Sequence, residues 1–385
     1  MNTIIGVFKS AKEVPSDLWM QLQHKNCFLD KTYLNAVEDS GYEGLTFYYI
    51  FKKSKATKEI TFHYFQVVDL AQRDLNSILN LDPYGQLLNV FSQVLDKFIF
   101  GIKRNKPHYL VVSGNILLSG DFGILSDNRD SKSLLESIEL IKKELNTAGK
   151  VVATIVKDLP KEDKMMDDLT KNKFLPMVMD PIMEFEVNTK WLKFDDYLQA
   201  LSSKYRVRAN NVMKKMEGVE IRDFNVDDFK KHKTTLYELY KGVQQKSPVR
   251  LLSCKIDYLS NLLSLSNDRI IFRTFWKDKK IIAFLTVIMN GSELEAHHIG
   301  FDYSLNKNLA IYQNILYHYI DLAIQHKMQR ISFGRTALEI KSTVGAIPIE
   351  YKAFIRFENR VVNSLLYHVF PEKSGDEWIQ RNPFK

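Results

Sequence analysis

The sequence lacks several features that would indicate a secreted, membrane-spanning or metal-bound protein. Its 385 residues include only two cysteines, Cys27 and Cys254, whose spacing fits neither a disulfide framework nor a zinc site. The longest apolar run, from Ile281 to Met289, is about half as long as a membrane span. The N-terminal stretch MNTIIGVFKSAKEVP has no signal-peptide core. We therefore expect a cytoplasmic protein without a transmembrane segment.

Common motifs of nucleotide chemistry and covalent catalysis are absent as well. A Walker A loop needs glycine directly before Lys-Ser/Thr, but in ISFGRTALEIKSTVGA Ile340 precedes Lys341. No Gly-x-Gly-x-x-Gly follows a strand, and no Gly-x-Ser-x-Gly elbow or Cys-His pairing supplies a nucleophile. Adjacent side chains on a strand diverge, so His297 and His298 should not share a ligand, and we expect no metal.

Charge is unevenly distributed along the chain. The net charge is +8, but residues 1–188 carry 23 basic and 25 acidic side chains, whereas residues 189–385 carry 31 and 21. A positive field over the second half favours a phosphate-bearing partner such as a nucleotide cofactor, a carrier protein, tRNA or an anionic lipid headgroup. A basic, solvated surface explains the same counts.

The order of predicted elements repeats in the two halves. In the first, a strand over 109–118 is followed by a glycine-containing loop, a helix over 131–145 and a strand over 150–156. In the second, a strand over 294–299 precedes a loop over 300–307, a helix over 309–325 and a strand over 330–333. A helical region over 192–216 joins them. We place the domain boundary near Asn188, which gives domains 1–188 and 189–385.

The second half resembles the Fem-type acyltransferases, within the superfamily of GCN5-related N-acyltransferases. The resemblance lies in SFGR followed by LEIKSTVGA, in SSKYRVRANNVMKKMEGVEI and LYELYKGVQQK, and in HHIGFDYSLNKNLAIYQNILYHYIDLAI. In the first half, FLDKTYLNAVE and VVSGNILLSGDFGIL are similar to the N-terminal domain of a bacterial branch with two such domains. The resemblance implies an α/β fold with two tandem domains, each a mixed sheet flanked by helices.

The family resemblance implies transfer of an acyl group to an amine. The leading hypothesis is an enzyme that takes an acyl thioester, on coenzyme A or a carrier protein, to an amine of an amino acid, a lipid or a cell-envelope precursor. A second hypothesis uses aminoacyl-tRNA to extend a peptidoglycan precursor, and a third is a non-catalytic ligand-binding module. We expect no permanent cofactor, no DNA partner, a possible peripheral membrane contact, and a structural or acceptor-binding N-terminal half.

Direct acyl transfer needs an aligned donor, a deprotonated amine and a stabilised oxyanion. Glu295 and His297 project together from one strand and are base candidates, although a salt-bridged Glu295 is an alternative. The resemblance matches Lys341 to a family lysine near the transferring carbonyl or the donor phosphates, with Arg335 in support. A surface ion pair of Lys341 with Glu339 or Glu350 is the competing interpretation.

Donor and acceptor contacts are expected at two further segments. The family's coenzyme A signature, Gln/Arg-x-x-Gly-x-Gly/Ala, is replaced here by Asn306, Lys307, Asn308, Leu309 and Ala310, which precede a helix N-terminus suited to pyrophosphate. Asn306 or Asn308 could instead cap that helix. Arg206 and Arg208 are candidates for an anion of the donor or acceptor, and Tyr312 could line the groove or belong to the core.

Overall fold

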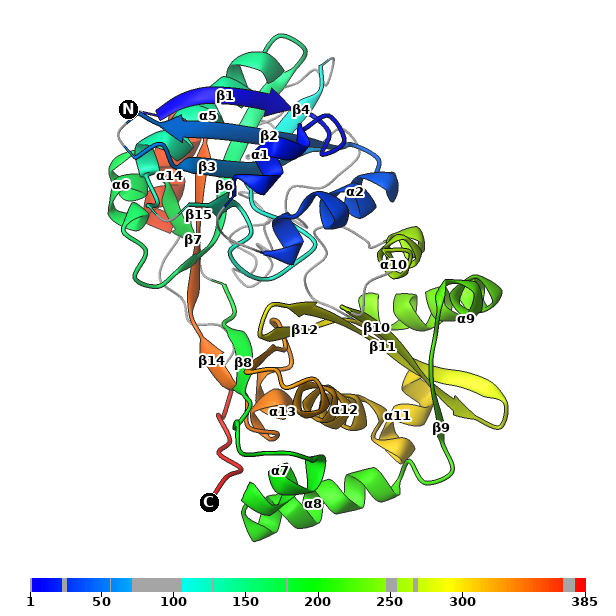
Figure 1. Ribbon diagram of the computed structural model, residues 1–385. Helices are drawn as coiled ribbons and strands as arrows, with labels where there is room; N and C mark the ends of the chain where they lie inside the picture. The colour runs from blue at the N-terminus through cyan, green and yellow to red at the C-terminus, as the bar shows by residue number, and fades with distance from the viewer. Residues whose placement is uncertain are drawn as a thin grey trace. The chain divides into compact units, whose positions relative to one another are not determined.

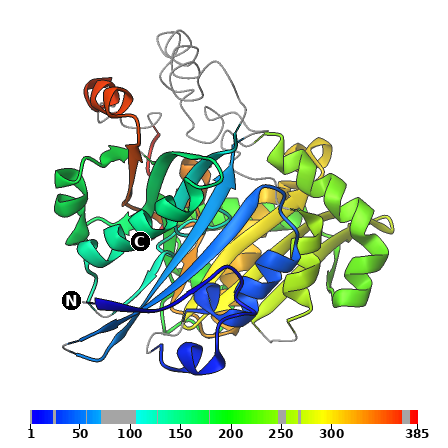
Figure 2. The ribbon, with the colours of Figure 1, turned by 90° about the horizontal axis from the view of Figure 1, so that it is seen from above.

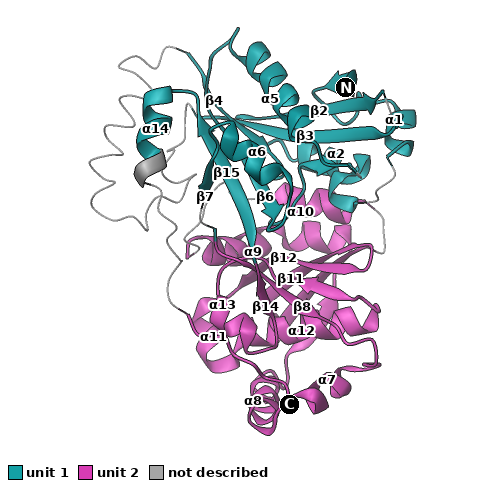
Figure 3. Cartoon of the chain, turned by 90° about the vertical axis from the view of Figure 1, so that its left-hand side faces the viewer, with its two compact units in different colours: residues 1–179, 248–253, 350–375 teal, residues 180–247, 254–349, 376–385 magenta. Residues whose placement is uncertain are grey.

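A computed structural model describes residues 2–22, 26–55, 57–70, 106–126, 128–177, 179–246, 255–265, 269–369 and 378–385. Cys254 lies outside the described residues. The chain forms two compact units (Figure 3): unit 1 comprises residues 1–179, 248–253 and 350–375, and unit 2 comprises residues 180–247, 254–349 and 376–385.

Unit 1 is built on a mixed sheet of order β1-β2-β3-β4-β6-β15-β7, with β5 paired to β3. The long strands β2 and β3 run side by side (Figure 2). Its strands are β1 (Asn2–Phe8), β2 (Leu45–Ser54), β3 (Ile60–Asp69), β4 (His108–Ser113), β5 (Ile124–Leu125), β6 (Lys150–Pro160), β7 (Leu175–Met177) and β15 (Tyr351–Phe357). Its helices are α1 (Ser16–Met20), η1 (Cys27–Leu29), α2 (Lys31–Asp39), α5 (Ser131–Leu145), α6 (Met165–Lys171) and α14 (Arg360–Val369).

Unit 2 repeats the same plan, with the sheet order β9-β10-β11-β12-β13-β8-β14. Figure 1 shows α9 and α10 on one face of this sheet and α11 and α12 on the other. Its strands are β8 (Ile182–Glu186), β9 (Glu220–Asp223), β10 (Ile270–Lys277), β11 (Lys280–Asn290), β12 (Glu293–Phe301), β13 (Arg330–Ser332) and β14 (Ile347–Ile349). Its helices are α7 (Phe194–Ala200), α8 (Ser203–Lys214), α9 (Val226–Gln244), α10 (Ile256–Leu263), α11 (Tyr303–Leu309), α12 (Ile311–Gln325) and α13 (Leu338–Ser342).

The two sheets exchange one strand each. β8, which follows β7 in the chain, inserts between β13 and β14 of unit 2. β15, which follows β14, inserts between β6 and β7 of unit 1. The units therefore differ from the sequence-based domains, because the chain crosses between units at 179/180 and residues 350–375 return to unit 1.

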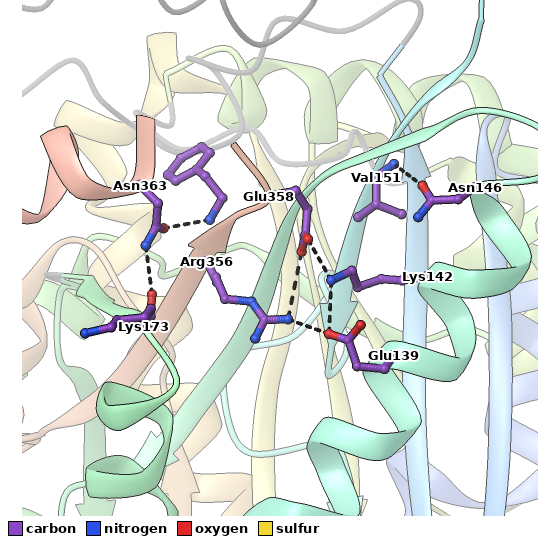
Figure 4. A network of polar contacts seen from close by, with 9 residues as sticks. Glu139, Lys142, Asn146, Val151, Lys173, Arg356, Glu358 and Asn363 are labelled. Carbon is purple, nitrogen blue, oxygen red and sulfur yellow. Dashed lines mark hydrogen bonds and ion pairs between the residues drawn. The ribbon is translucent and has the colours of Figure 1, made fainter. Parts of the chain in front are cut away.

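Ion pairs between side chains of α5 and β15 accompany this exchange in unit 1 (Figure 4). Arg356 Nη2 lies 2.8 Å from Glu139 Oε1, and Lys142 Nζ lies 3.0 Å from the same oxygen and 2.6 Å from Glu358 Oε2. Arg356 also stacks over the ring of Phe174, 4.6 Å from its centroid. These contacts link a C-terminal strand to a helix formed much earlier in the chain.

The predicted fold class and most local elements are confirmed. Each unit is a mixed sheet flanked by helices, and the helix predicted over 131–145 coincides with α5. Residues 303–307, predicted to lie in a loop, instead belong to the helix α11, which is capped by the Asp302 side chain through Ser304 N. Within the described ranges, no helix combines the length and apolarity needed to cross a membrane.

Candidate functional site

A buried acid lies at the point where two parallel strands of unit 2 separate. Glu295 on β12 is opposite Ser332 on β13, and Ser332 is in turn opposite Glu184 on β8. Because side chains alternate along strands, these three residues share one face of the sheet, away from the core residue Leu294. Glu295 is only 8% exposed. The β12–β13 ladder ends at the Glu295–Ser332 pair, although β12 continues to Phe301.

Lys341 is buried, with only 4% of its surface exposed. Its ammonium nitrogen donates hydrogen bonds to Gly334 O at 3.1 Å and Arg335 O at 2.6 Å. These acceptors belong to the turn after β13, in which Thr336 and Ala337 adopt φ values of 66° and 49°. Left-handed backbone at two non-glycine residues is strained, so the turn geometry is held by its surroundings rather than by local preference.

The surface ion pairs considered for Lys341 are not formed. Glu339 instead pairs with Arg381, 2.5 Å from its Nη2, and Glu350 pairs with Lys161 at 2.8 Å. An ammonium group has three hydrogens, and the two carbonyls of the 334–335 turn take two of them. No described residue bonds to the third tetrahedral position of Lys341 Nζ, which carries a hydrogen in the charged form or the lone pair in the neutral form.

Burial shifts both ionisable groups towards neutral pH. It raises the pKa of Glu295 to about 8, with Glu293 and Glu184 adding to the rise and the bond from Ser332 and the charge of Lys341 opposing it. Burial lowers the pKa of Lys341 to about 7, although the negative charges of Glu295 and Asp180 oppose this shift. The charge of each group affects the pKa of the other, so they titrate as a coupled pair.

Arg335 has an anchoring contact in the structure. Its Nη1 donates to the carbonyl of Asp180, 2.5 Å away, in the segment that leads into β8. The backbone carbonyl of the same arginine accepts from Lys341. Arg335 therefore connects the strained turn to the exchanged strand, in addition to any role with a ligand.

A β-bulge on β12 places the two adjacent histidines together. The register with β11 shifts between the Leu285–Ile299 and Val287–Ala296 pairs, so Thr286 faces both His297 and His298. The ring centroids of these histidines are 4.1 Å apart. The prediction that their side chains diverge is therefore wrong, because it assumed unbroken alternation along the strand.

Both histidines lie in a polar cluster with aromatic neighbours. His297 Nε2 is 2.9 Å from Tyr258 Oη, and its Nδ1 is 3.3 Å from Thr286 Oγ1. His298 packs edge-on against Tyr240, and its Nε2 is buried with no hydrogen-bond partner in the part of the chain that the structure describes. Burial lowers the pKa of His297 well below its usual value, with the neighbouring His298 adding to the effect. The pKa of His298 is lowered to about 4 by burial.

The expected donor loop has a different local structure. Because α11 occupies 303–309, Asn306 lies one turn before the start of α12, where its Oδ1 accepts from Tyr312 N at 2.9 Å. Asn306 is therefore a cap of α12, as the structural alternative allowed. Lys307 and Asn308 are exposed, and Ala310 is left-handed, with φ 49° and ψ 44°.

The remaining candidates lie around the same end of α12. Arg206 and Arg208 are on α8, where Arg206 is half-buried and Arg208 exposed. Asn314 Nδ2, buried in α12, donates to Val212 O of α8 at 3.0 Å, which brings the end of α8 to the start of α12. Tyr312 is half-buried and packs against the core, with its ring 6.2 Å from that of Phe301, and burial raises its pKa.

Sequence reasoning did not identify four residues of this region. Ser332 and Glu184 meet Glu295 only through pairing of strands distant in the chain, and Tyr258 comes from a helix that carries no motif. Thr286 becomes important only because of the bulge. The alternation of polar Glu184, Glu293, Glu295 and Ser332 with buried apolar neighbours was the one available signal.

Comparison with known proteins gives the fold. A scan against protein-family models found no match, and a search of curated proteins found no match either. Among solved structures, FemX has a TM-score of 0.57 at 10% identity, covering 94% of this chain and 100% of its own. A tandem GNAT protein from the clavulanic acid biosynthesis pathway has a TM-score of 0.48 at 7% identity, covering 93% and 98%. The C-terminal domain of a putative lysylphosphatidylglycerol synthetase from Agrobacterium fabrum has a TM-score of 0.45 at 9% identity, covering 92% of this chain and 95% of its own. The chain thus has the fold of FemX.

Proposed function

We propose that this protein is an N-acyltransferase that moves an acyl group from an acyl thioester to an amine of an amino acid, a lipid or a cell-envelope precursor. The observation that carries the proposal is the burial of two ionisable residues of unit 2, Glu295 at the separation of β12 and β13 and Lys341, whose charges affect each other's pKa. Unit 2 is the transferring unit in this proposal. Unit 1 is structural or binds the acceptor.

The separation of the two strands suits an extended donor. Beyond Glu295, the edge of β12 that faces β13 has no strand partner among the described residues. Main-chain groups at such an edge pair with an extended ligand by β-augmentation. The pantetheine arm of coenzyme A or a carrier protein is extended and contains two amides, so it can pair with residues 296–301. Its thioester would then lie near the Glu295 end.

The proposed chemistry uses the one free position of Lys341 Nζ. As the amine attacks the thioester carbonyl, negative charge develops on the carbonyl oxygen, and a hydrogen of Lys341 ammonium stabilises it. The amine loses its proton as the carbon–nitrogen bond forms, and the thiolate leaves when the tetrahedral intermediate collapses. Glu295 as carboxylate accepts the amine proton, directly or through water. Arg335 holds the turn that orients Lys341.

The donor's phosphates have a basic surface within reach of α12. Lys307 on α11 and Lys214 and Lys215 at the end of α8 are exposed near the N-terminus of α12. We assign Asn306 to Ala310 and Arg206 and Arg208 to this anion-binding region, with Asn306 acting through the cap of α12. Tyr312 supports the region from the edge of the core.

Ligand-dependent thermal unfolding tests the donor class. Coenzyme A or acyl-coenzyme A at 100 times its dissociation constant should stabilise the protein by about 2.7 kcal/mol. Lys307→Ala should weaken that shift, while Lys190→Ala, at an exposed lysine of the same unit, should not. Turnover of an acyl-coenzyme A with amine acceptors should fall at least tenfold in Lys341→Met. Full turnover in Lys341→Met would refute the proposed role of this residue.

Aminoacyl-tRNA remains the second candidate donor because the basic residues around α8 and α12 would also contact an RNA backbone. A tRNA complex should lose affinity steeply with salt through counterion release. Stabilisation by charged tRNA but by no thioester would replace the leading proposal with peptide-bond formation on a peptidoglycan precursor. Absence of both effects would favour a carrier-protein donor or a non-catalytic module.

A further inference from the structure

Helix α8 concentrates positive charge on the surface of unit 2. Residues 202–216 contain five basic side chains and no acidic one. None of the five forms an ion pair with another residue that the structure describes. The five basic residues are Lys204, Arg206, Arg208, Lys214 and Lys215.

The lysines of the neighbouring helix α9 have acidic partners. Lys230, Lys231 and Lys241 each pair with an acid three residues earlier in the same helix. Lys233 pairs with Asp257 of α10. The unpaired cations are therefore a property of α8 and not of exposed lysines throughout this unit.

The placement of these charges weakens α8 as a helix. Lys204 is in its first turn, where the helix dipole disfavours a cation. Lys204 and Arg208 are four residues apart, so two like charges are neighbours on the helix surface. Lys204 Nζ also lies 5.8 Å from the ring centroid of Tyr205, a weak contact at an exposed site. An anion outside the chain would relieve both unfavourable effects.

The outward side of α8 combines charge with an exposed apolar side chain. Ala209 and Val212 face the core of unit 2. On the opposite side, helical spacing produces an exposed strip about 15 Å long, formed by Lys204, Val207, Asn211 and Lys214 and here called the outer strip. Val207 is 58% exposed and lies between the two lysines. Figure 1 shows α8 at the margin of unit 2, beside α7.

An anionic lipid surface matches the outer strip better than a nucleic acid does. The carbon stems of lysines lie along an apolar surface while their ammonium groups reach lipid phosphates. A valine between them enters the boundary between headgroups and acyl chains, as the apolar side of an interfacial helix does. An RNA backbone offers no apolar layer to a valine, and the outer strip has no aromatic side chain on which a base could stack.

We propose that α8 docks unit 2 on the surface of an anionic membrane, with Lys204 and Lys214 at lipid phosphates and Val207 at the edge of the acyl chains. Each lysine close to an anionic leaflet strengthens binding roughly fivefold. Salt weakens this attraction, because ions screen charges beyond about 10 Å at 0.1 M. Docking needs no acyl donor and no transfer, so it is independent of the proposed function.

Sedimentation of the full chain with lipid vesicles tests the docking surface. The chain should bind vesicles that contain phosphatidylglycerol, should not bind vesicles of phosphatidylcholine alone, and should be released by salt. Lys204→Gln removes one unit of charge and should weaken binding roughly fivefold, and Lys204→Glu changes the charge by two and should weaken it roughly 25-fold. Lys204→Arg should bind like the parent. Equal binding to both kinds of vesicle, or binding to neither, would overturn the proposal.

Matched variants elsewhere separate α8 from the overall charge of the protein. Lys230→Gln on α9 removes an exposed lysine that is paired, and it should change vesicle binding by less than about twofold. A loss as large as that of Lys204→Gln would show that net charge attracts the vesicles, which would overturn the role of α8. Val207→Ser should weaken binding roughly fourfold, whereas Val361→Ser, at a 72% exposed valine of unit 1, should not. Equal effects of these two substitutions would contradict insertion of Val207.

Two further measurements separate docking from loss of folding and from RNA binding. Urea unfolding of Lys204→Gln and Val207→Ser should show no loss of stability, because both side chains are exposed. If either variant is destabilised, the other still tests the surface. Binding of tRNA that depends on Lys204, without binding to anionic vesicles, would overturn membrane docking and assign α8 to a nucleic acid. Vesicle binding as expected, with no transfer from any donor, would support docking while the proposed function fails.

Discussion

Replacing Lys341 with methionine should change how stability depends on pH. A lysine in the unfolded chain keeps its proton up to its ordinary pKa of 10.5, but the folded protein lowers this pKa to about 7. Between these two values the unfolded state binds more protons than the folded state, so the free energy of unfolding contributed by Lys341 rises with pH. Below about pH 7 this contribution is constant and unfavourable, because the charged amine is buried.

The size of the effect follows from the two pKa values. A full difference of one bound proton changes the free energy of unfolding by about 1.36 kcal/mol per pH unit. At pH 7 the folded state still binds part of the Lys341 proton, so the difference in bound protons is less than one at the start of the range. Integrated from pH 7 to pH 9, the free energy of unfolding therefore rises by about 2 kcal/mol. Lys341→Met removes this rise. It also raises the pKa of Glu295 further, by removing a nearby positive charge, which acts in the same direction.

Urea unfolding of the parent and the variant at pH 7, 8 and 9 provides the measurement. Tryptophan fluorescence is a suitable probe because Trp191, Trp276 and Trp378 belong to unit 2 and only Trp19 to unit 1. The free energy of unfolding of the parent should rise by about 2 kcal/mol relative to that of the variant across this range. For Lys190→Met, at an exposed site, the free energy of unfolding should depend on pH in the same way as in the parent. Parallel curves for Lys341→Met would show that Lys341 titrates normally, and the argument from its burial would be wrong.

Three further predictions concern the same unit. Turnover should follow a bell-shaped pH profile with limbs near 7 and 8, and Glu295→Gln should lose one limb. Between pH 5 and 7 the free energy of unfolding of this variant should rise by roughly 2.5 kcal/mol relative to that of the parent, because a raised carboxyl pKa destabilises the parent progressively as pH rises from 4.5 to about 8. Equal pH dependence of the two free energies of unfolding would contradict this prediction. Ala337→Gly should stabilise the protein by roughly 1 kcal/mol in urea unfolding, because φ is 49° there, whereas Ala200→Gly in α7 should destabilise it; the same sign for both would count against strain in the turn. Asn306→Ala should cost about 1 kcal/mol of stability through loss of the α12 cap and should also weaken donor binding in calorimetry; unchanged stability would show that the cap is dispensable.

Local sequence signals predicted elements whose stability is itself local. The helix over 131–145 has an Asp130 cap and buried apolar positions at helical spacing, so both of its ends were predictable. In contrast, none of the seven residues of α11 is buried, so the helix has no apolar period to detect. Its one local signal is the capping Asp302, and the Asn-Lys-Asn sequence that follows is more typical of a loop.

The candidate site was predictable in its residue types but not in its geometry. The sequence pointed to Glu295, His297 and Lys341, yet the burial of Lys341 depends on two carbonyls of a strained turn, and strain at Thr336 and Ala337 runs against their intrinsic preferences. The bulge that turns His298 towards His297 likewise has no proline or glycine to mark it at that position. These features are imposed by the surrounding sheet.

The exchange of β8 and β15 explains why a linear boundary does not describe this chain. Each strand alternates or concentrates apolar residues in the same way as its neighbours, so its pattern predicts a strand but not the sheet that receives it. The sheet is chosen by non-local partners: Phe185 of β8 joins the core of unit 2, and Phe354 of β15 joins the core of unit 1. The N-terminal sequence half therefore lacks the strand that lies between β6 and β7, and it can complete its sheet only after residues 351–357 have been synthesised. Glu184, which neighbours Ser332 in the candidate site, reaches unit 2 by the reciprocal exchange, so the same topology that links the two units also completes the site.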